Sequence, residues 1–318
     1  MIKIDPRNPR GIIWLASYPK SGNTWLRIFL YHITRIMQGV PLEGNDLHQL
    51  DRSSLYEARQ VALFEHFLGR PSAEVEWRDI LRVRPQVQAE IVRRANQVVF
   101  VKTHMALAAV EGTPVINLGV TLGAIYVARN PLDVVLSLAN HMGIPLEYAV
   151  ECLCLDGYRV PHTAIEVYEP WGSWRENVGS WSSARQDSIL LIRYEDMLSE
   201  PSKVFGAVMK HLGQRVTAAQ IDEAIGLSSF QRLSKMEEEH PFRERSPHAE
   251  RFFRVGRANQ WREKLTEEQI ARIVSFNHRY MRRFGYMTPE LEKYVVEGDL
   301  GKPHAAKGVN PAEASAGQ

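Results

Sequence analysis

Apolar positions in this chain follow two repeats, because short apolar runs of strand length alternate with longer stretches in which apolar residues recur at helical spacing. The expected strands cover residues 11–17, 97–102, 122–128 and 188–193. The expected helices cover residues 24–38, 131–141, 173–185, 196–212 and 266–283. Strands that alternate with helices form a parallel sheet covered on both faces. The sequence therefore predicts an α/β fold with a central parallel sheet flanked by helices.

Polar segments directly follow three of the four expected strands. Lys20 comes after the first strand, the segment from Lys102 to His104 ends the second, and Arg129 follows the third. In open α/β sheets the ligand lies at the carboxyl ends of the strands. We therefore expect these side chains to converge on one crevice.

The first of these segments has the chemistry of an anion-binding loop. A helix N-terminus carries partial positive charge and unpaired N–H donors, and Gly22 allows the backbone to approach a ligand closely. Lys20, Ser21 and Thr24 add side-chain donors for phosphate or sulfate oxygens. The order of residues is not that of a Walker A loop. Taken alone, the loop fits either an anion site or a polar strand-to-helix turn.

The segment Lys20-Ser21-Gly22-Asn23-Thr24-Trp25, after Tyr18-Pro19, resembles the loop with which cytosolic-type sulfotransferases hold the 5′-phosphosulfate of 3′-phosphoadenosine 5′-phosphosulfate (PAPS). Further segments match that family in the same order. They are Val99 to His104, Tyr126 to Ser137, Gly172 to Trp174 with Trp181, Arg193 to Met197, Ser229-Phe230, and Phe252 to Gly256 with Trp261. The resemblance spans residues 11 to about 285. It implies the sulfotransferase fold, with a P-loop-like phosphosulfate-binding loop in one domain over residues 1–300.

The resemblance also implies a role for each matching residue. Lys20 would approach the oxygen that bridges phosphate and sulfate, Lys102 would bind the transferring sulfuryl group, and His104 would be the general base. The cofactor site implied in this way consists of Lys20, Ser21, Gly22, Asn23, Thr24, Trp25, Arg129, Ser137, Tyr194, Ser229, Phe230, Phe252, Arg254 and Gly256. Within it, Trp25 would stack on adenine, and Arg129 with Ser137 would hold the 3′-phosphate.

The implied reaction is one in-line displacement that leaves adenosine 3′,5′-bisphosphate (PAP). The acceptor is expected to be a small molecule with an alcohol, phenol or amine group, and no metal is expected. Two other classes remain open on the residues alone. They are a P-loop-like ATP- or GTP-dependent kinase and a non-catalytic nucleotide-binding protein.

Three departures from the family pattern limit what is carried over. Asn23 stands where a threonine is usual, and Val255 stands where a basic residue is common. Glu267 and Ala271 interrupt the family's dimerisation motif. We therefore carry over no dimer, and the oligomeric state stays open.

Residues 40–97 form a longer segment than this family leads us to expect, and they combine apolar side chains with many charges. The apolar ones are Leu42, Leu47, Phe64, Phe67, Leu68 and Trp77. The segment suits a lid over the acceptor pocket or a helical elaboration packed on the surface. Candidate apolar walls of that pocket are Met105, Met142, Tyr148 and Trp171. Such walls suit a phenol, a steroid-like or a lipid alcohol.

Composition agrees with a globular enzyme. The chain has 318 residues, of which 44% are hydrophobic and 24% charged, so it can bury a large core. Its net charge of +2 is too small for bulk nucleic-acid binding. Residues 301–318 are rich in Ala, Gly, Pro and Lys and are expected to be disordered.

The cellular location is predicted from the signal-peptide and membrane-span patterns, neither of which the sequence shows. Residues 1–10 lack the apolar core of a signal peptide, and no run approaches the roughly 20 apolar residues of a membrane span. The two cysteines, Cys152 and Cys154, lie too close together for an easy disulfide and are expected to be packed thiols. A cytoplasmic enzyme is therefore expected.

Overall fold

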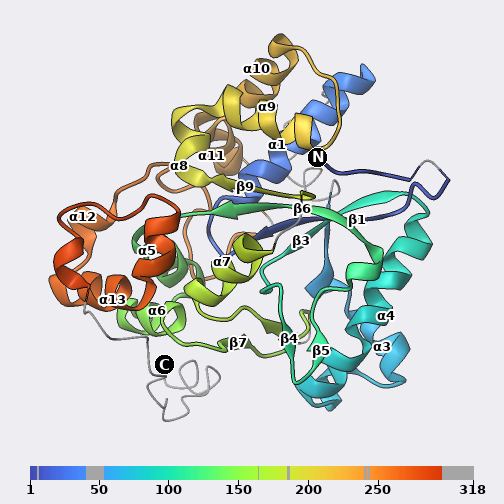
Figure 1. Ribbon diagram of the computed structural model, residues 1–318, viewed down its shortest axis with the longest axis horizontal. Coiled ribbons are helices and arrows are strands. Elements are labelled where there is room, and N and C mark those ends of the chain that lie inside the picture. Colours follow the sequence, from blue (N-terminus) through green and yellow to red (C-terminus); the bar gives the residue numbers. More distant parts are fainter. Residues whose placement is uncertain are drawn as a thin grey trace.

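Five parallel strands form the central sheet of the computed structural model, in the order β2-β3-β1-β6-β9 (Figure 1). The structure describes residues 1–5, 7–40, 54–163, 165–184, 187–239, 242 and 244–295. The strands are β1 (Gly11–Ser17), β2 (Leu55–Tyr56), β3 (Val98–Thr103), β6 (Thr121–Ala128) and β9 (Ile189–Arg193). The predicted α/β class and parallel sheet are confirmed, and the four predicted strands begin and end within one residue of their expected bounds. Two antiparallel ribbons pair β4 (Ala109–Val110) with β5 (Thr113–Pro114) and β7 (Arg159–Val160) with β8 (Glu169–Pro170).

Strand β1 lies in the middle of the sheet and is buried on both faces. Because side chains alternate along a strand, Trp14 and Ala16 pack into one hydrophobic cluster while Ile13 and Leu15 pack into another. Helices α1, α9 and α10 contribute to the second cluster, on the upper side of the sheet in Figure 1. Helices α4, α5, α6, α7 and α13 contribute to the first. The sheet is thus covered on both faces, as the continuous apolar runs predict.

Four of the described helices begin at side-chain caps. The Asn130 side chain accepts the N–H of Leu132 ahead of α5, and Pro131 occupies its first turn. Capping boxes start α7, α10 and α13 at Ser173, Thr217 and Thr266. The helices are α1 (Asn23–Gln38), α3 (Val61–Leu68), α4 (Trp77–Ala95), α5 (Pro131–Met142), α6 (Leu146–Leu153), α7 (Trp174–Ser183), α8 (Tyr194–Ser199), α9 (Pro201–His211), α10 (Ala218–Leu227), α11 (Phe230–Glu239), α12 (Trp261–Lys264) and α13 (Glu267–Arg283).

The prediction of one helix over residues 196–212 is wrong, because the structure has two helices there, α8 and α9. Glu200 lies between them with φ −135° and ψ 54°, outside the helical region. Pro201 follows it, and a proline disfavours the helical conformation in the residue before it. The same proline is well placed in the first turn of α9.

The described part of the 40–97 segment packs into the main core. Helix α3 buries Phe64 completely, and α4 buries Ile80 and Val87 against the same cluster. Phe67, Leu68 and Trp77 lie partly buried beside them. The segment also supplies β2, one of the two edge strands of the sheet. Leu42 and Leu47, like residues 301–318, lie outside the described residues.

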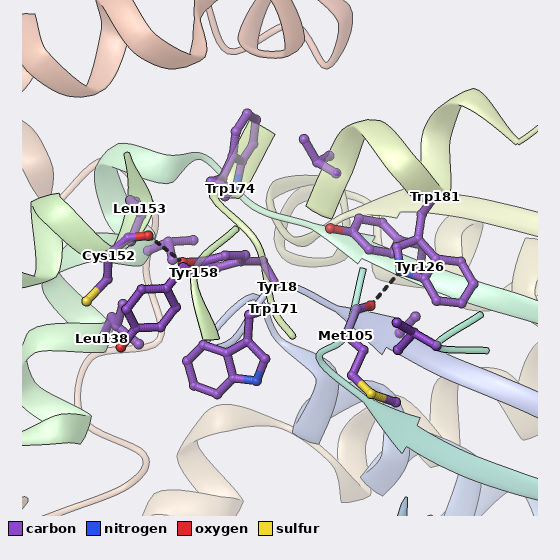
Figure 2. Close-up of a cluster of buried hydrophobic side chains, with 14 of the residues drawn as sticks. Tyr18, Met105, Tyr126, Leu138, Cys152, Leu153, Tyr158, Trp171, Trp174 and Trp181 are labelled. Atoms are coloured by element: carbon purple, nitrogen blue, oxygen red, sulfur yellow. Dashed lines mark hydrogen bonds between the residues drawn. The ribbon is translucent and has the colours of Figure 1, made fainter. Parts of the chain in front are cut away.

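Aromatic rings fill the space between the sheet and α7 (Figure 2). The indole N–H of Trp181 donates to the carbonyl oxygen of Met105 at 3.0 Å, and the hydroxyl of Tyr18 reaches the carbonyl oxygen of Cys152 at 3.5 Å. Cys152 and Cys154 are free thiols, and burial raises their pKa values to about 11 and about 12. Among the described helices, none has the length and apolarity needed to cross a membrane.

Candidate active site

The loop between β1 and α1 has the backbone of an anion cradle. Lys20 and Gly22 have φ of 65° and 104°, and α1 begins at the next residue, Asn23. A Cβ atom on Gly22 would lie 2.6 Å from Cδ2 of Tyr194, so only glycine fits under that ring. Left-handed residues at a helix N-terminus turn N–H groups toward one point.

Two side chains of this loop have different surroundings. The Ser21 hydroxyl is fully buried and has no hydrogen-bond partner in the described part of the chain. The Asn23 amide nitrogen instead turns back to the carbonyl oxygen of Leu15, 2.8 Å away, and to the Ser17 hydroxyl. Ser21 is therefore left with an unsatisfied donor that an anion could use, whereas the Asn23 side-chain nitrogen braces the end of β1.

Several cationic side chains lie near Lys20. Its ammonium nitrogen lies 4.2 Å from the centroid of the Phe252 ring, and its carbonyl oxygen accepts a 3.0 Å hydrogen bond from Arg129 Nη1. Burial lowers the pKa of Lys20 to about 7, and the nearby cations Lys102, Arg129 and Arg254 act in the same direction while Glu244 opposes them. A buried, partly neutralised lysine of this kind gains its full charge when an anion binds beside it.

His104 follows β3 and lies beside the end of β1. Its Nδ1 is 2.9 Å from the main-chain carbonyl oxygen of Ser17. Because a carbonyl oxygen can only accept, Nδ1 must carry the proton, which leaves the lone pair on Nε2. Burial, and then the charge of Lys102, lower the pKa of His104 well below its usual value. The imidazole is therefore neutral at physiological pH, which is the state that a general base requires.

Asn177, on α7, binds the main chain of both His104 and Trp171. Its amide nitrogen donates to the carbonyl oxygens of His104 and Trp171, both at 2.8 Å. Its amide oxygen accepts from the Tyr126 hydroxyl at 2.8 Å. The side chain is completely buried and all three of these bonds are internal.

Two aromatic rings flank His104. The centroid of Tyr56 lies 6.2 Å from that of the imidazole, and the centroid of Trp171 lies 6.1 Å from it, both edge-on. The expected wall residue Trp171 thus lies at the candidate base. The side chain of another wall candidate, Met105, instead lies in the interior, where its sulfur contacts Arg84 Nη1. The Met105 carbonyl oxygen accepts a hydrogen bond from the Trp181 indole. The walls beside His104 are therefore aromatic and partly polar.

A carboxylate that the sequence did not single out reaches the same place. Glu244 accepts from Arg27 Nη1 at 2.6 Å and from the Thr24 hydroxyl at 3.2 Å, and it lies 3.5 Å from Lys102 Nζ. Burial acts to raise the pKa of Glu244, but Lys102 and Arg27 together hold it well below its usual value. The Glu244 carboxylate therefore contacts both the β1–α1 helix start and Lys102.

Two of the predicted 3′-phosphate residues, Arg129 and Arg254, lie near Lys20. The Arg129 guanidinium lies 4.4 Å from the centroid of the Tyr194 ring, and that ring meets Trp25 edge-on at 6.2 Å. Arg254 donates to the Asn140 amide oxygen at 3.0 Å, which connects its loop to the helix that carries Ser137.

The loop that contains Arg254 packs closely on the start of α11. Gly256 has φ of 63°, and a Cβ atom there would lie 2.4 Å from the Phe230 ring. Ser229 directly precedes Phe230 and receives the first helical bond, from the N–H of Leu233 at 3.0 Å. The structure thus brings together the sequence segments that hold Lys20, Arg129, Tyr194, Phe230 and Gly256, which are far apart along the chain.

A cavity of about 840 Å³ lies next to this region but is separate from it. Its walls include Ala106, Pro170, Arg175, Arg279 and Tyr280. None of the candidate catalytic or cofactor residues named above lines it.

Comparison with known proteins agrees with this arrangement. The model of the sulfotransferase domain family matches residues 11–285. Flavonol 3-sulfotransferase of Flaveria bidentis is 23% identical over 300 residues, which cover 82% of this chain and 78% of that protein. The crystal structure of mouse sulfotransferase SULT7A1 complexed with PAP has a TM-score of 0.57 at 22% identity, covering 92% of this chain and 91% of that chain.

Retinol dehydratase in a complex with retinol and PAP has the same TM-score of 0.57 at 19% identity, covering 85% of this chain and 81% of that chain. These two structures share the fold of this chain. The family match extends over most of the described residues and includes each segment that forms the site. The chain therefore belongs to the sulfotransferase family, and it is an enzyme of the kind that takes a sulfuryl group from PAPS.

Proposed function

We propose that this enzyme transfers the sulfuryl group of PAPS to the hydroxyl of a small aromatic or polycyclic acceptor, with His104 as the general base. The observation that carries the proposal is the position of the His104 imidazole, whose Nδ1 lies 2.9 Å from the Ser17 carbonyl oxygen, so that the Nε2 lone pair is left to take a proton. Lys102 lies two residues before His104, near the carboxyl end of β3.

The residues of the β1–α1 loop fit the donor. The buried Ser21 hydroxyl, which has no partner among the described residues, is a donor that an oxyanion would use, and Gly22 lets the loop backbone pack closely under Tyr194. Lys20, Ser21, Gly22 and Thr24 would hold the phosphosulfate, and Trp25, Arg129, Ser137 and Tyr194 would hold the nucleotide. When bound, the donor supplies a sulfuryl group joined to a phosphate that leaves readily.

The chain's own residues then have separate tasks. His104 Nε2 accepts the proton of the acceptor hydroxyl as that oxygen forms its bond to sulfur and the bond between sulfur and the phosphate oxygen breaks. Lys102 neutralises charge on the sulfuryl oxygens, and Lys20 neutralises the charge that develops on the departing phosphate. Positioning and charge neutralisation therefore supply most of the catalysis, as in phosphoryl transfer.

The aromatic rings beside His104 support the proposed class of acceptor. Tyr56 and Trp171 flank the imidazole edge-on, and such walls suit a flat molecule whose hydroxyl points at Nε2. The similar proteins named above include a flavonol sulfotransferase and a retinol-binding enzyme, which supports a planar or extended apolar acceptor. An amine in the place of the hydroxyl would need the same base.

Calorimetric titration with PAP, and separately with ATP plus Mg²⁺, tests the proposal. We expect tight binding of PAP that does not change when a chelator is added, followed by turnover of PAPS with at least one phenol or sterol of an acceptor panel. Preference for Mg-ATP, or PAP binding without transfer to any hydroxyl acceptor, would contradict the proposal.

A further inference from the structure

Lys102 lies over the ring of Tyr56, a residue that the sequence did not single out. Tyr56 pairs with Lys102 in the register of β2 and β3, and the Lys102 ammonium lies 4.2 Å from the centroid of the Tyr56 ring. The Tyr56 hydroxyl donates a 2.7 Å hydrogen bond to Oε2 of Glu169. The same oxygen accepts from the Trp171 indole N–H at 3.1 Å. One buried carboxylate therefore holds both rings that flank His104.

Glu169 makes no ion pair among the described residues, and burial raises its pKa while its hydrogen bonds to Tyr56 and Trp171 and the charge of Arg84 lower it. The residue is only 2% exposed, and its second oxygen, Oε1, has no hydrogen-bond partner in the described residues. The neighbouring buried acid Glu57 pairs with Arg84 at 3.0 Å, whereas Glu169 makes its two hydrogen bonds to neutral ring donors. A buried carboxylate costs free energy unless nearby positive charge compensates it.

The charged groups around Lys102 come from several elements. Burial, Arg27 and Arg59 lower the pKa of Lys102, while Glu244 and Glu169 oppose them. Lys102 in turn lowers the pKa values of Lys20, His104 and His141.

Of the two carboxylates that oppose burial, Glu244 contacts Thr24 of the anion loop and Arg27, so it lies where a bound anion would compete with it. Glu169 instead acts through the Tyr56 ring, because it accepts the hydrogen bond of the Tyr56 hydroxyl.

We propose that Tyr56 and Glu169 are positioning residues that hold the Lys102 ammonium in its charged form and point it toward the anion loop. The ring attracts the ammonium through a cation–π contact. Donation of the phenol proton to a carboxylate places additional electron density on that ring and fixes its orientation. The use of Lys102 on a sulfuryl group rests on the proposed function, but its protonation and placement do not.

Lysine NMR of the whole protein tests this directly. The chain has ten lysines, so protein labelled with ¹³C at the lysine side chains gives few signals, and Lys102→Arg identifies the one to follow. We expect Tyr56→Phe and Glu169→Gln each to lower the pH midpoint of the Lys102 signal by about 0.5–1 unit. The double variant should shift it no further than the larger single shift, because the two side chains act through one hydrogen bond.

A matched control is available in Tyr158→Phe. Tyr158 is also a buried phenol and also flanks Trp171, with ring centroids 6.0 Å apart, but it does not contact Lys102. The control should leave the Lys102 midpoint unchanged. An unchanged midpoint in both Tyr56→Phe and Glu169→Gln would overturn the proposal, and if Glu169→Gln does not fold, Tyr56→Phe alone decides, because it keeps the ring.

A kinetic measurement separates this proposal from the proposed function. In the two variants, the alkaline limb of the kcat profile should move to lower pH by the same amount as the NMR midpoint, with little change in KM for PAPS. If the NMR midpoint moves and no acceptor is sulfated, the placement of Lys102 stands and the assigned reaction is wrong. If sulfation proceeds and the midpoint does not move, the reaction stands and the Tyr56–Glu169 proposal is wrong.

Discussion

Nδ1 of His104 lies 2.9 Å from the main-chain carbonyl oxygen of Ser17, across the junction of β3 and β1. The two strands are paired in register up to Ala16 and Thr103, so the carbonyl and the imidazole meet where the pairing ends. The tautomer of the candidate base is therefore fixed by sheet geometry.

Replacement of that imidazole should stop turnover and leave cofactor binding nearly intact. We expect His104→Ala to lower kcat by at least about 10²–10⁴-fold, because the acceptor proton then has no positioned base. The Kd for PAP, measured by calorimetry, should change less than about threefold, since His104 serves the acceptor. Retained turnover in His104→Ala would remove the base assignment.

The pH profile should follow the lowered pKa of His104. The base works only when neutral, so activity is lost as pH falls through its folded-state pKa, which burial places well below 6.5. We expect kcat/KM at saturating PAPS to stay level from pH 7 down past pH 6. A decline centred near 6.5 would show instead that the imidazole titrates like one in water.

Lys20 should take up a proton when PAP binds. Its pKa is about 7 without ligand, so at pH 8 most of the lysine is neutral, and a phosphate beside it raises the pKa. Affinity should therefore fall as pH rises above 7. Calorimetry in two buffers of different ionisation enthalpy should report uptake of about one proton at pH 8.

Lys20→Arg is the matched control for this measurement, because arginine is always charged. The proton uptake should disappear in that variant while binding persists. Uptake that persists in Lys20→Arg would assign the proton to another group, such as Lys102.

Glu244→Gln should strengthen binding of PAPS. The carboxylate contacts Thr24, Lys102 and Arg27, so a bound anion must displace a charge that an amide lacks. We expect KM for PAPS to fall by roughly 3–10-fold, about 0.7–1.4 kcal/mol. Glu238→Gln, which breaks the exposed pair with Arg251, should leave KM unchanged. A higher KM in Glu244→Gln would show that the carboxylate assists donor binding.

Gly22→Ala should damage the anion loop. The new Cβ would lie 2.6 Å from the Tyr194 ring at a φ of 104°, and such strain costs about 1–3 kcal/mol. We expect PAP affinity to fall at least about tenfold. Gly213→Ala is the control, since Gly213 has φ of 71° but nothing within 4 Å. That variant should lose some thermal stability and keep its PAP affinity.

The sequence indicated that several candidate residues lie at strand ends. Lys20, Lys102, His104 and Arg129 each stand at or beyond the end of a strand, and the parallel order of the strands brings these ends to one edge. The strand that carries Tyr56 was not predicted, because two residues show no periodicity.

Contacts between distant parts of the chain left no local signal either. The Tyr56–Glu169 hydrogen bond joins residues 113 positions apart, and the Lys102–Glu244 bond joins residues 142 positions apart. A single sequence does not show which of its many carboxylates folding will bring beside a given lysine. The polar character of the wall beside His104 therefore became visible only in the folded chain.

The amide of Asn177 binds the carbonyl oxygens of both His104 and Trp171. The proposed proton acceptor and the proposed aromatic wall are thus both bound to one side chain, which couples the position of one to that of the other. A change of substrate preference can come from exchanging ring size or polarity at Trp171 while the imidazole keeps its place. In such a scaffold, selectivity can diverge between related enzymes without any loss of reaction geometry.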